Sequence, residues 1–216
     1  MSQGLLQFGL TAFVTLTVVV DPFSVVPIFI AMTRQMKATE RKAIVTRAVM
    51  TAFTVTLFFL LAGRAVLTYL GVTVHAFAIS GGILLFATAL PMLFGQRPAL
   101  QSSARDQPGI ADENIAIFPL AIPLLSGPGT ITTILLLTDQ ANGSPQRLAV
   151  LVMAIVMVYL LTLLVLYSGE WLINHMGEGK VHIISRVLGI VLAAVAVQYM
   201  LNGITGHYNE LMRRSG

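Results

Sequence analysis

Two stretches, VDPFSVVP at residues 20–27 and PLLSGPGT at residues 123–130, interrupt long apolar runs of this chain. The first lies within the run 5–32 and the second within the run 114–138. Proline in a helix interior removes a hydrogen bond and breaks or kinks the helix. Pro22 and Pro128 lie 106 residues apart. The two stretches therefore predict one broken helix in each half of the chain, which is typical of the binding sites of secondary transporters.

The spacing of 106 residues recurs along the chain and indicates an internal duplication. At this offset the matched pairs are Arg41 with Arg147, Gly63 with Gly169, and Gly71 with Gly177. After a slip of one residue, His75 matches His182 and Gly82 matches Gly189. We therefore expect two structurally equivalent halves.

The composition predicts an integral membrane protein. Of the 216 residues, 56% are hydrophobic and 10% are charged, and the mean hydropathy is +0.84, which does not suit a soluble globule. A helix needs about 20 apolar residues to cross the hydrocarbon core of a bilayer. Six runs reach this length: 5–32, 43–62, 73–94, 114–138, 148–167 and 186–204. None alternates as a strand does, so we expect helices and exclude a β-barrel.

The number of runs in each half predicts the relation between the halves. Each repeat has three runs, an odd number, so the second repeat enters the membrane from the opposite side. The predicted fold is an all-α integral membrane protein with six transmembrane helices, arranged as two inverted three-helix repeats, with helices 1 and 4 broken. The expected parts are a first repeat at 1–95, a cytoplasmic linker at 96–113, a second repeat at 114–206 and a C-terminal tail at 207–216.

The basic residues predict the orientation of the chain. Nine lie in the three loops on one side: Arg34, Lys37, Arg41, Lys42, Arg47, Arg97, Arg105, Lys180 and Arg186. Four lie on the other side: Arg64, Arg147, Arg213 and Arg214. Cytoplasmic loops carry the excess of Lys and Arg, so we expect both termini outside the cytoplasm. The net charge of +4 reflects this topology, and no nucleic-acid partner is expected.

The two interruptions predict a binding site at mid-depth in the membrane. Asp21 is a favoured N-cap before Pro22, and Ser126 or Gly127 stands in the same position before Pro128. Each restarted helix exposes unpaired N–H groups and the positive end of its dipole. Two such ends attract an anionic group, such as the carboxylate of an amino acid. The expected substrate-binding residues are Asp21, Pro22, Ser24, Ser126, Gly127, Pro128, Gly129 and Thr130, with further hydroxyls from Thr132 and Thr133.

Asp21 has a second expected role. It is the acidic residue near the middle of an apolar run, whereas Asp139 and Glu170 lie at the ends of runs. A carboxylate inside the membrane is a candidate carrier of a coupling ion, here a proton or a sodium ion. The alternative is that Asp21 only caps the restarted helix, and the two roles are compatible.

Other classes of protein fit the sequence less well. The chain has no P-loop, no HExxH, no GxSxG and no cysteine, so we expect neither an enzyme nor a metal or cofactor site. A channel is one alternative, although its polar lining should extend along the helices rather than gather at mid-depth. A non-transporting membrane scaffold is the other alternative. A homo-oligomer is left open.

The motifs DPFSVVPIF at 21–29 and PLAIPLLSGPGTIT at 119–132, within the layout of six runs, resemble the MarC/SnatA family of bacterial inner-membrane proteins. The resemblance covers essentially the full length, and its most specific part is Gly127-Pro128-Gly129-Thr130-Ile131. It implies a multi-pass protein of the bacterial inner membrane, in contact with the lipid bilayer, that transports a small neutral amino acid such as alanine or glycine. Together with the charge count, it implies periplasmic termini.

Overall fold

The computed structural model describes residues 2–33, 36–94 and 116–215, and every regular element in these ranges is a helix. The elements are α1 (Ser2–Val20), α2 (Pro22–Thr33), α3 (Ala38–Tyr69), α4 (Val74–Phe94), η1 (Ala116–Leu125), α7 (Pro128–Ala141), α8 (Pro145–Tyr167) and α9 (Gly169–Ser215). The all-helical prediction is confirmed for these residues. The linker predicted at 96–113 lies outside them.

Within these ranges, five helical stretches are long and apolar enough to cross a membrane. They are Gln3–Thr33, Ala38–Tyr69, Val74–Phe94, Pro145–Tyr167 and Ile183–Met212. Each coincides with one of the predicted runs. The fourth predicted run differs, because it is divided into η1 with 10 residues and α7 with 14 residues, and each is shorter than a membrane span requires.

Both predicted interruptions are present. α1 ends at Val20 and α2 begins at Pro22, whereas η1 ends at Leu125 and α7 begins at Pro128. The sequence did not predict that η1 is a π-helix. Its sequence contains Pro119 and Pro123, and proline in general disfavours a regular α-helix interior.

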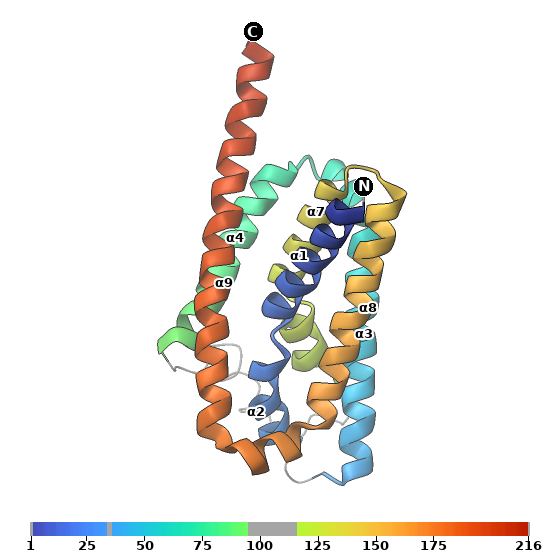
Figure 1. The fold of residues 1–216 in the computed structure, drawn as a ribbon, viewed down its shortest axis with the longest axis vertical. Coiled ribbons are helices and arrows are strands. Elements are labelled where there is room, and N and C mark those ends of the chain that lie inside the picture. Colours follow the sequence, from blue (N-terminus) through green and yellow to red (C-terminus); the bar gives the residue numbers. More distant parts are fainter. Residues whose placement is uncertain (1, 34–35, 95–115, 216) are drawn as a thin grey trace.

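Both chain termini lie at the same end of the bundle (Figure 1). This end, called the termini end below, also holds the α3–α4 loop at 70–73 and the α7–α8 loop at 142–144 (Figure 1). The opposite end, called the α8–α9 end, holds the end of α2, the start of α3 and the α8–α9 junction (Figure 1). α9 continues past the rest of the bundle, and the tail predicted at 207–216 is helical through Ser215.

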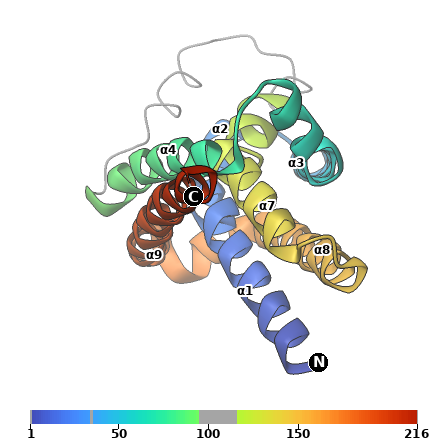
Figure 2. The same ribbon diagram turned by 90° about the horizontal axis from the view of Figure 1, so that it is seen from above.

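The helices pack in a regular pattern. α4 lies beside α9 on one flank and α3 beside α8 on the other, with α2 and α7 between these pairs (Figure 2). α1 packs on α8 and η1 packs on α3, while α2 packs on α9 and α7 packs on α4. A large apolar core joins residues on both sides of the interruptions, such as Val20, Val26 and Leu125. A smaller core contains Leu85 and Leu192.

The outer surface of the bundle is also apolar. Large side chains such as Leu61, Phe94 and Leu164 are more than half exposed, at 83%, 71% and 62%. An apolar exterior of this kind matches a hydrocarbon surrounding. The structure therefore agrees with the multi-pass membrane protein that the composition predicts.

Candidate functional site

The first helix restart is at Asp21, where one helix follows another without a loop. Its φ angle is +44°, a left-handed conformation that Asp adopts more readily than most residues. The Asp21 N–H still donates to the Thr17 carbonyl at 3.0 Å. An N-cap residue usually has an extended backbone. Asp21 instead ends α1 in the left-handed conformation and begins α2.

The Asp21 side chain caps α2, as the sequence predicted. Its Oδ1 accepts the Ser24 N–H at 3.4 Å, at the third residue of the new helix, where such caps usually bond. Asp21 is only 7% exposed. The Ser24 Oγ is buried, and no group in the described residues has hydrogen-bond geometry with it. The first restart therefore holds a buried carboxyl next to an unsatisfied hydroxyl.

The second restart is built differently. Gly127 is the N-cap of α7, with an extended backbone at φ −72° and ψ 177°, and Pro128 begins the helix. No side chain caps this helix. Ser126, the other predicted cap, is not one, because its Oγ donates to the Ala121 carbonyl at 2.9 Å. The π-helical turn brings that carbonyl within reach, and the Ser126 N–H donates to it as well.

The threonine hydroxyls of α7 all donate to backbone carbonyls. Thr130 bonds to the Leu125 carbonyl at 3.2 Å, Thr132 to that of Pro128 at 2.8 Å, and Thr133 to that of Gly129 at 2.9 Å. A hydroxyl has one hydrogen to donate. In this conformation these side chains therefore offer a ligand acceptor capacity rather than a free hydrogen.

The two restarts lie close together. A Cβ placed on Gly129 would lie 3.4 Å from Val19 Cγ1 in α1 and would overlap the Leu85 side chain. Val19 stands two residues before Asp21. Pro22, Ser126, Gly127, Gly129 and Thr130 are buried, whereas Ser24 is half-buried and Pro128 is exposed. Most of the predicted site residues are thus in the interior, around one contact between α1 and α7.

Two tyrosines complete this region and were missed by sequence reasoning. The Tyr159 hydroxyl donates to the Leu125 carbonyl at 3.5 Å and lies 2.6 Å from Thr56 Oγ1. The Tyr199 hydroxyl donates to Thr133 Oγ1 at 3.2 Å. The sequence contained a signal for these two bonds, because each tyrosine lies inside an apolar run, where its hydroxyl requires a hydrogen-bond partner.

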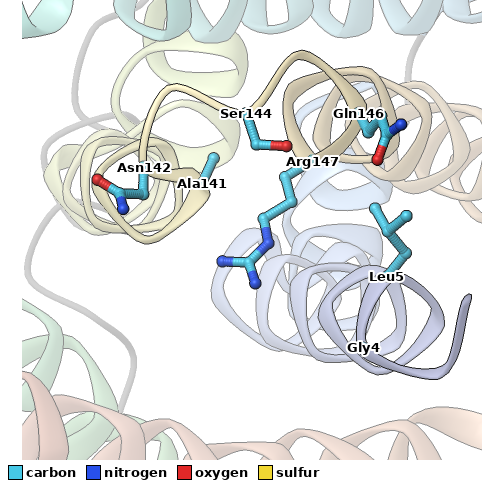
Figure 3. A pocket seen from close by; sticks show the side chains of 7 residues that line it. All are labelled: Gly4, Leu5, Ala141, Asn142, Ser144, Gln146 and Arg147. Carbon is cyan, nitrogen blue, oxygen red and sulfur yellow. The ribbon is translucent and has the colours of Figure 1, made fainter. Parts of the chain in front are cut away.

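Two cavities at the surface lie outside the region of the two restarts. One, of about 460 Å³, lies at the termini end between α1 and the α7–α8 loop (Figure 3). The other, of about 160 Å³, lies between α2 and the α8–α9 junction and is lined by Phe23, Leu164, Val165, Ser168 and Leu172. Neither of these two cavities is lined by a predicted site residue.

A sequence profile described as MarC family integral membrane protein matches residues 6–208. The UPF0056 membrane protein MJ1677 of Methanocaldococcus jannaschii is 34% identical over 93% of this chain and 98% of its own length. The UPF0056 inner membrane protein YhgN of Escherichia coli is 33% identical over 90% and 95% of the two chains. The UPF0056 membrane protein YvbG of Bacillus subtilis is 31% identical over 95% and 98%. No solved structure matches this chain.

Proposed function

The chain belongs to the MarC family of integral membrane proteins, and from this and the geometry of its two helix restarts we propose that it is a secondary transporter of small neutral amino acids. The observation that carries the proposal is the meeting of two helix starts in the interior, at Asp21–Pro22 and Gly127–Pro128. Broken helices that face each other at mid-depth are the usual site of substrate and coupling ion in such carriers.

The proposed fold is a pair of inverted three-helix repeats, in which η1 and α7 together form the fourth of six spans. The contacts of repeat-matched residues support it. A Cβ on Gly82 would lie 2.7 Å from the Ala196 carbonyl, and a Cβ on Gly189 would lie 3.6 Å from the Ala89 carbonyl. Since 82 matches 189 and 89 matches 196 at the offset of 107, these are the same contact made twice.

A second pair lies on the expected axis between the repeats. Phe53 and Tyr159 are matched at the offset of 106, and their rings touch edge to face with centroids 5.7 Å apart. Two equivalent residues contact each other only where they lie next to the symmetry axis. Tyr159 also bonds to the carbonyl of Leu125, immediately before the second restart. The axis therefore passes beside the proposed site.

The two restarts offer opposite chemistry to a solute. The start of α7 has no side-chain cap, so its N–H groups and dipole favour a carboxylate. The start of α2 holds the buried Asp21 carboxyl, which is suited to a positive coupling ion, a proton or sodium. A small neutral amino acid supplies the carboxylate and has little side chain to accommodate in a closed interior.

The relatives support a location in the inner membrane, since the Escherichia coli protein is named as an inner membrane protein. The excess of Lys and Arg in the loops predicted on the side away from the termini supports a cytoplasmic location for these loops and periplasmic termini.

A thermal-shift screen of the purified protein in detergent tests the proposed ligand class. A ligand that binds only the folded state stabilises it by about 2.7 kcal/mol at 100 times its Kd. Glycine or alanine should raise the unfolding temperature, whereas glycinamide, which lacks the carboxylate, should not. If no amino acid shifts the transition, the scaffold alternative replaces the transporter.

A further inference from the structure

The cavity of about 460 Å³ at the termini end is polar on one side. Its wall on α1 is formed by Gly4 and Leu5, and the opposite wall includes Asn142, Ser144 and Arg147. Figure 3 shows the Arg147 side chain extending from α8 into the space between the loop and α1. The cavity therefore combines a fixed positive charge with amide and hydroxyl groups.

Arg147 has no carboxylate partner within the part of the chain that the structure describes. Its Nη1 donates to the Gln140 carbonyl at 3.0 Å, and its guanidinium lies 5.9 Å from the centroid of the Phe8 ring. A guanidinium has five N–H donors in a planar fork. Most of these donors therefore remain available to a group in the cavity.

Arg41 matches Arg147 in the other repeat, and it binds a carboxylate. Arg41 donates from Nε to the Met36 carbonyl at 3.1 Å, and Arg147 donates from Nη1 to the Gln140 carbonyl at 3.0 Å. Arg41 also forms an ion pair with Glu170. The residue that matches Glu170 at the offset of 106 is Arg64. At the termini end, the position of the acid is thus taken by a base.

The acid nearest the cavity in sequence is already neutralised. Asp139 lies two residues before Ala141 in the cavity wall, and it pairs with Arg64 at 2.9 Å. Ser144 is the N-cap of α8 and makes no side-chain capping bond. Because Ser144 also lines the cavity, the positive end of this helix lies at the cavity wall. Charge at this cavity is therefore positive overall.

We propose that the cavity lined by Leu5, Ser144 and Arg147 binds the carboxylate of a small solute through Arg147, as Arg41 binds the Glu170 carboxylate at the opposite end of the bundle. The Arg147 guanidinium binds both carboxylate oxygens, and Ser144 lines the same cavity from the loop. This site is distinct from the helix restarts. It uses the repeat relation proposed above but does not depend on transport.

A reactive-thiol experiment tests the site, because the chain has no cysteine and a single introduced thiol is unique. Leu5→Cys places this thiol on the α1 wall, and Gln146→Cys places it on the α8 side as a second variant. In a non-ionic detergent, an anionic methanethiosulfonate should react faster than a cationic one at either thiol. Adding Arg147→Gln should lower this rate ratio by roughly tenfold, the lower end of what a charged cleft does to on-rates.

The double variant Arg64→Gln/Asp139→Asn is the control, since it removes an arginine at the same end of the bundle together with the carboxylate that it pairs with. It should leave the ratio within about twofold, because neither residue lines the cavity and their charges cancel. Acetate and glycine should slow the modification, whereas acetamide should not. An equal effect of Arg147→Gln and of the double variant, or equal protection by acetamide, would overturn the proposal.

The same variants in lipid nanodiscs separate a solute from a lipid headgroup. Protection by acetate that is unchanged when anionic lipid is added supports the solute. If anionic lipid protects the thiol and acetate does not, the cavity is a headgroup site and the proposal is wrong. Since no step of this experiment measures transport, its failure is distinguishable from a failure of the transporter proposal.

Discussion

Asp21 combines two backbone roles, since it ends α1 with φ +44° and caps α2 through the Ser24 N–H. Asn fulfils both, because it tolerates the left-handed conformation and caps about as well as Asp. What Asn lacks is the negative charge that a coupling cation requires. This single substitution therefore separates the structural role of Asp21 from its proposed role in coupling.

We predict that Asp21→Asn keeps the fold and the passive exchange of solute but abolishes accumulation driven by an ion gradient. Unfolding temperature in detergent and uptake into proteoliposomes measure the two effects. As a control, Asp21→Ala removes the cap and keeps a β-carbon at positive φ, so it should lose about 1–2 kcal/mol of stability. Full gradient-driven accumulation by Asp21→Asn would show that the residue is only a cap.

Gly129 allows α7 to approach α4 and α1 at the second restart. A Cβ there would overlap Leu85, and overpacking of this kind costs about 1–3 kcal/mol. We predict that Gly129→Ala destabilises the protein by this amount, and that the cost falls to near zero in a Leu85→Ala background. A double-mutant cycle on thermal stability measures the coupling. Simple additivity of the two substitutions would mean that the two side chains do not meet.

At the scale of single elements, the sequence predicted both breaks because their cause is local. Proline and a residue that begins a helix are sufficient to stop one helix and start another. It did not predict the π-helix, and it offered Ser126 as a cap although that hydroxyl bonds to the Ala121 carbonyl. The partners of Tyr159 and Tyr199 could not be predicted either. These hydrogen bonds depend on which helices pack against each other, and the apolar runs alone do not specify this packing.

The pairing of α4 with α9 gives a prediction for the repeat relation. Gly82 and Gly189 make equivalent contacts across this pair, so Gly82→Ala and Gly189→Ala should each destabilise the protein by about 1–3 kcal/mol. Gly179→Ala in α9 meets nothing within 4 Å and should stabilise it slightly, by up to about 1 kcal/mol. Thermal unfolding in detergent compares the three variants. A large cost for only one of the two paired glycines would argue against equivalent halves.

At the scale of the whole molecule, both termini lie at one end of the bundle (Figure 1). The excess of basic residues in the loops predicted at the other end sets the expected orientation. We predict that a reporter fused after Gly216 is periplasmic and that a tag within 96–113 is cytoplasmic. Protease protection in spheroplasts reads both positions. The reverse result would show that Arg213 and Arg214, rather than the first loop, determine the orientation.

The central claim is that the two helix restarts form the site of a carrier, and solute counterflow tests it most directly. Proteoliposomes that contain the purified protein are loaded with unlabelled alanine and diluted into a trace of labelled alanine. A carrier that exchanges solute through one site should accumulate the label transiently above its outside concentration. Gly129→Leu should abolish this peak, because its side chain would overlap Leu85 and displace α7 at the second restart. Label that only equilibrates, as through a channel, or that does not exceed the level in protein-free liposomes, would contradict the claim.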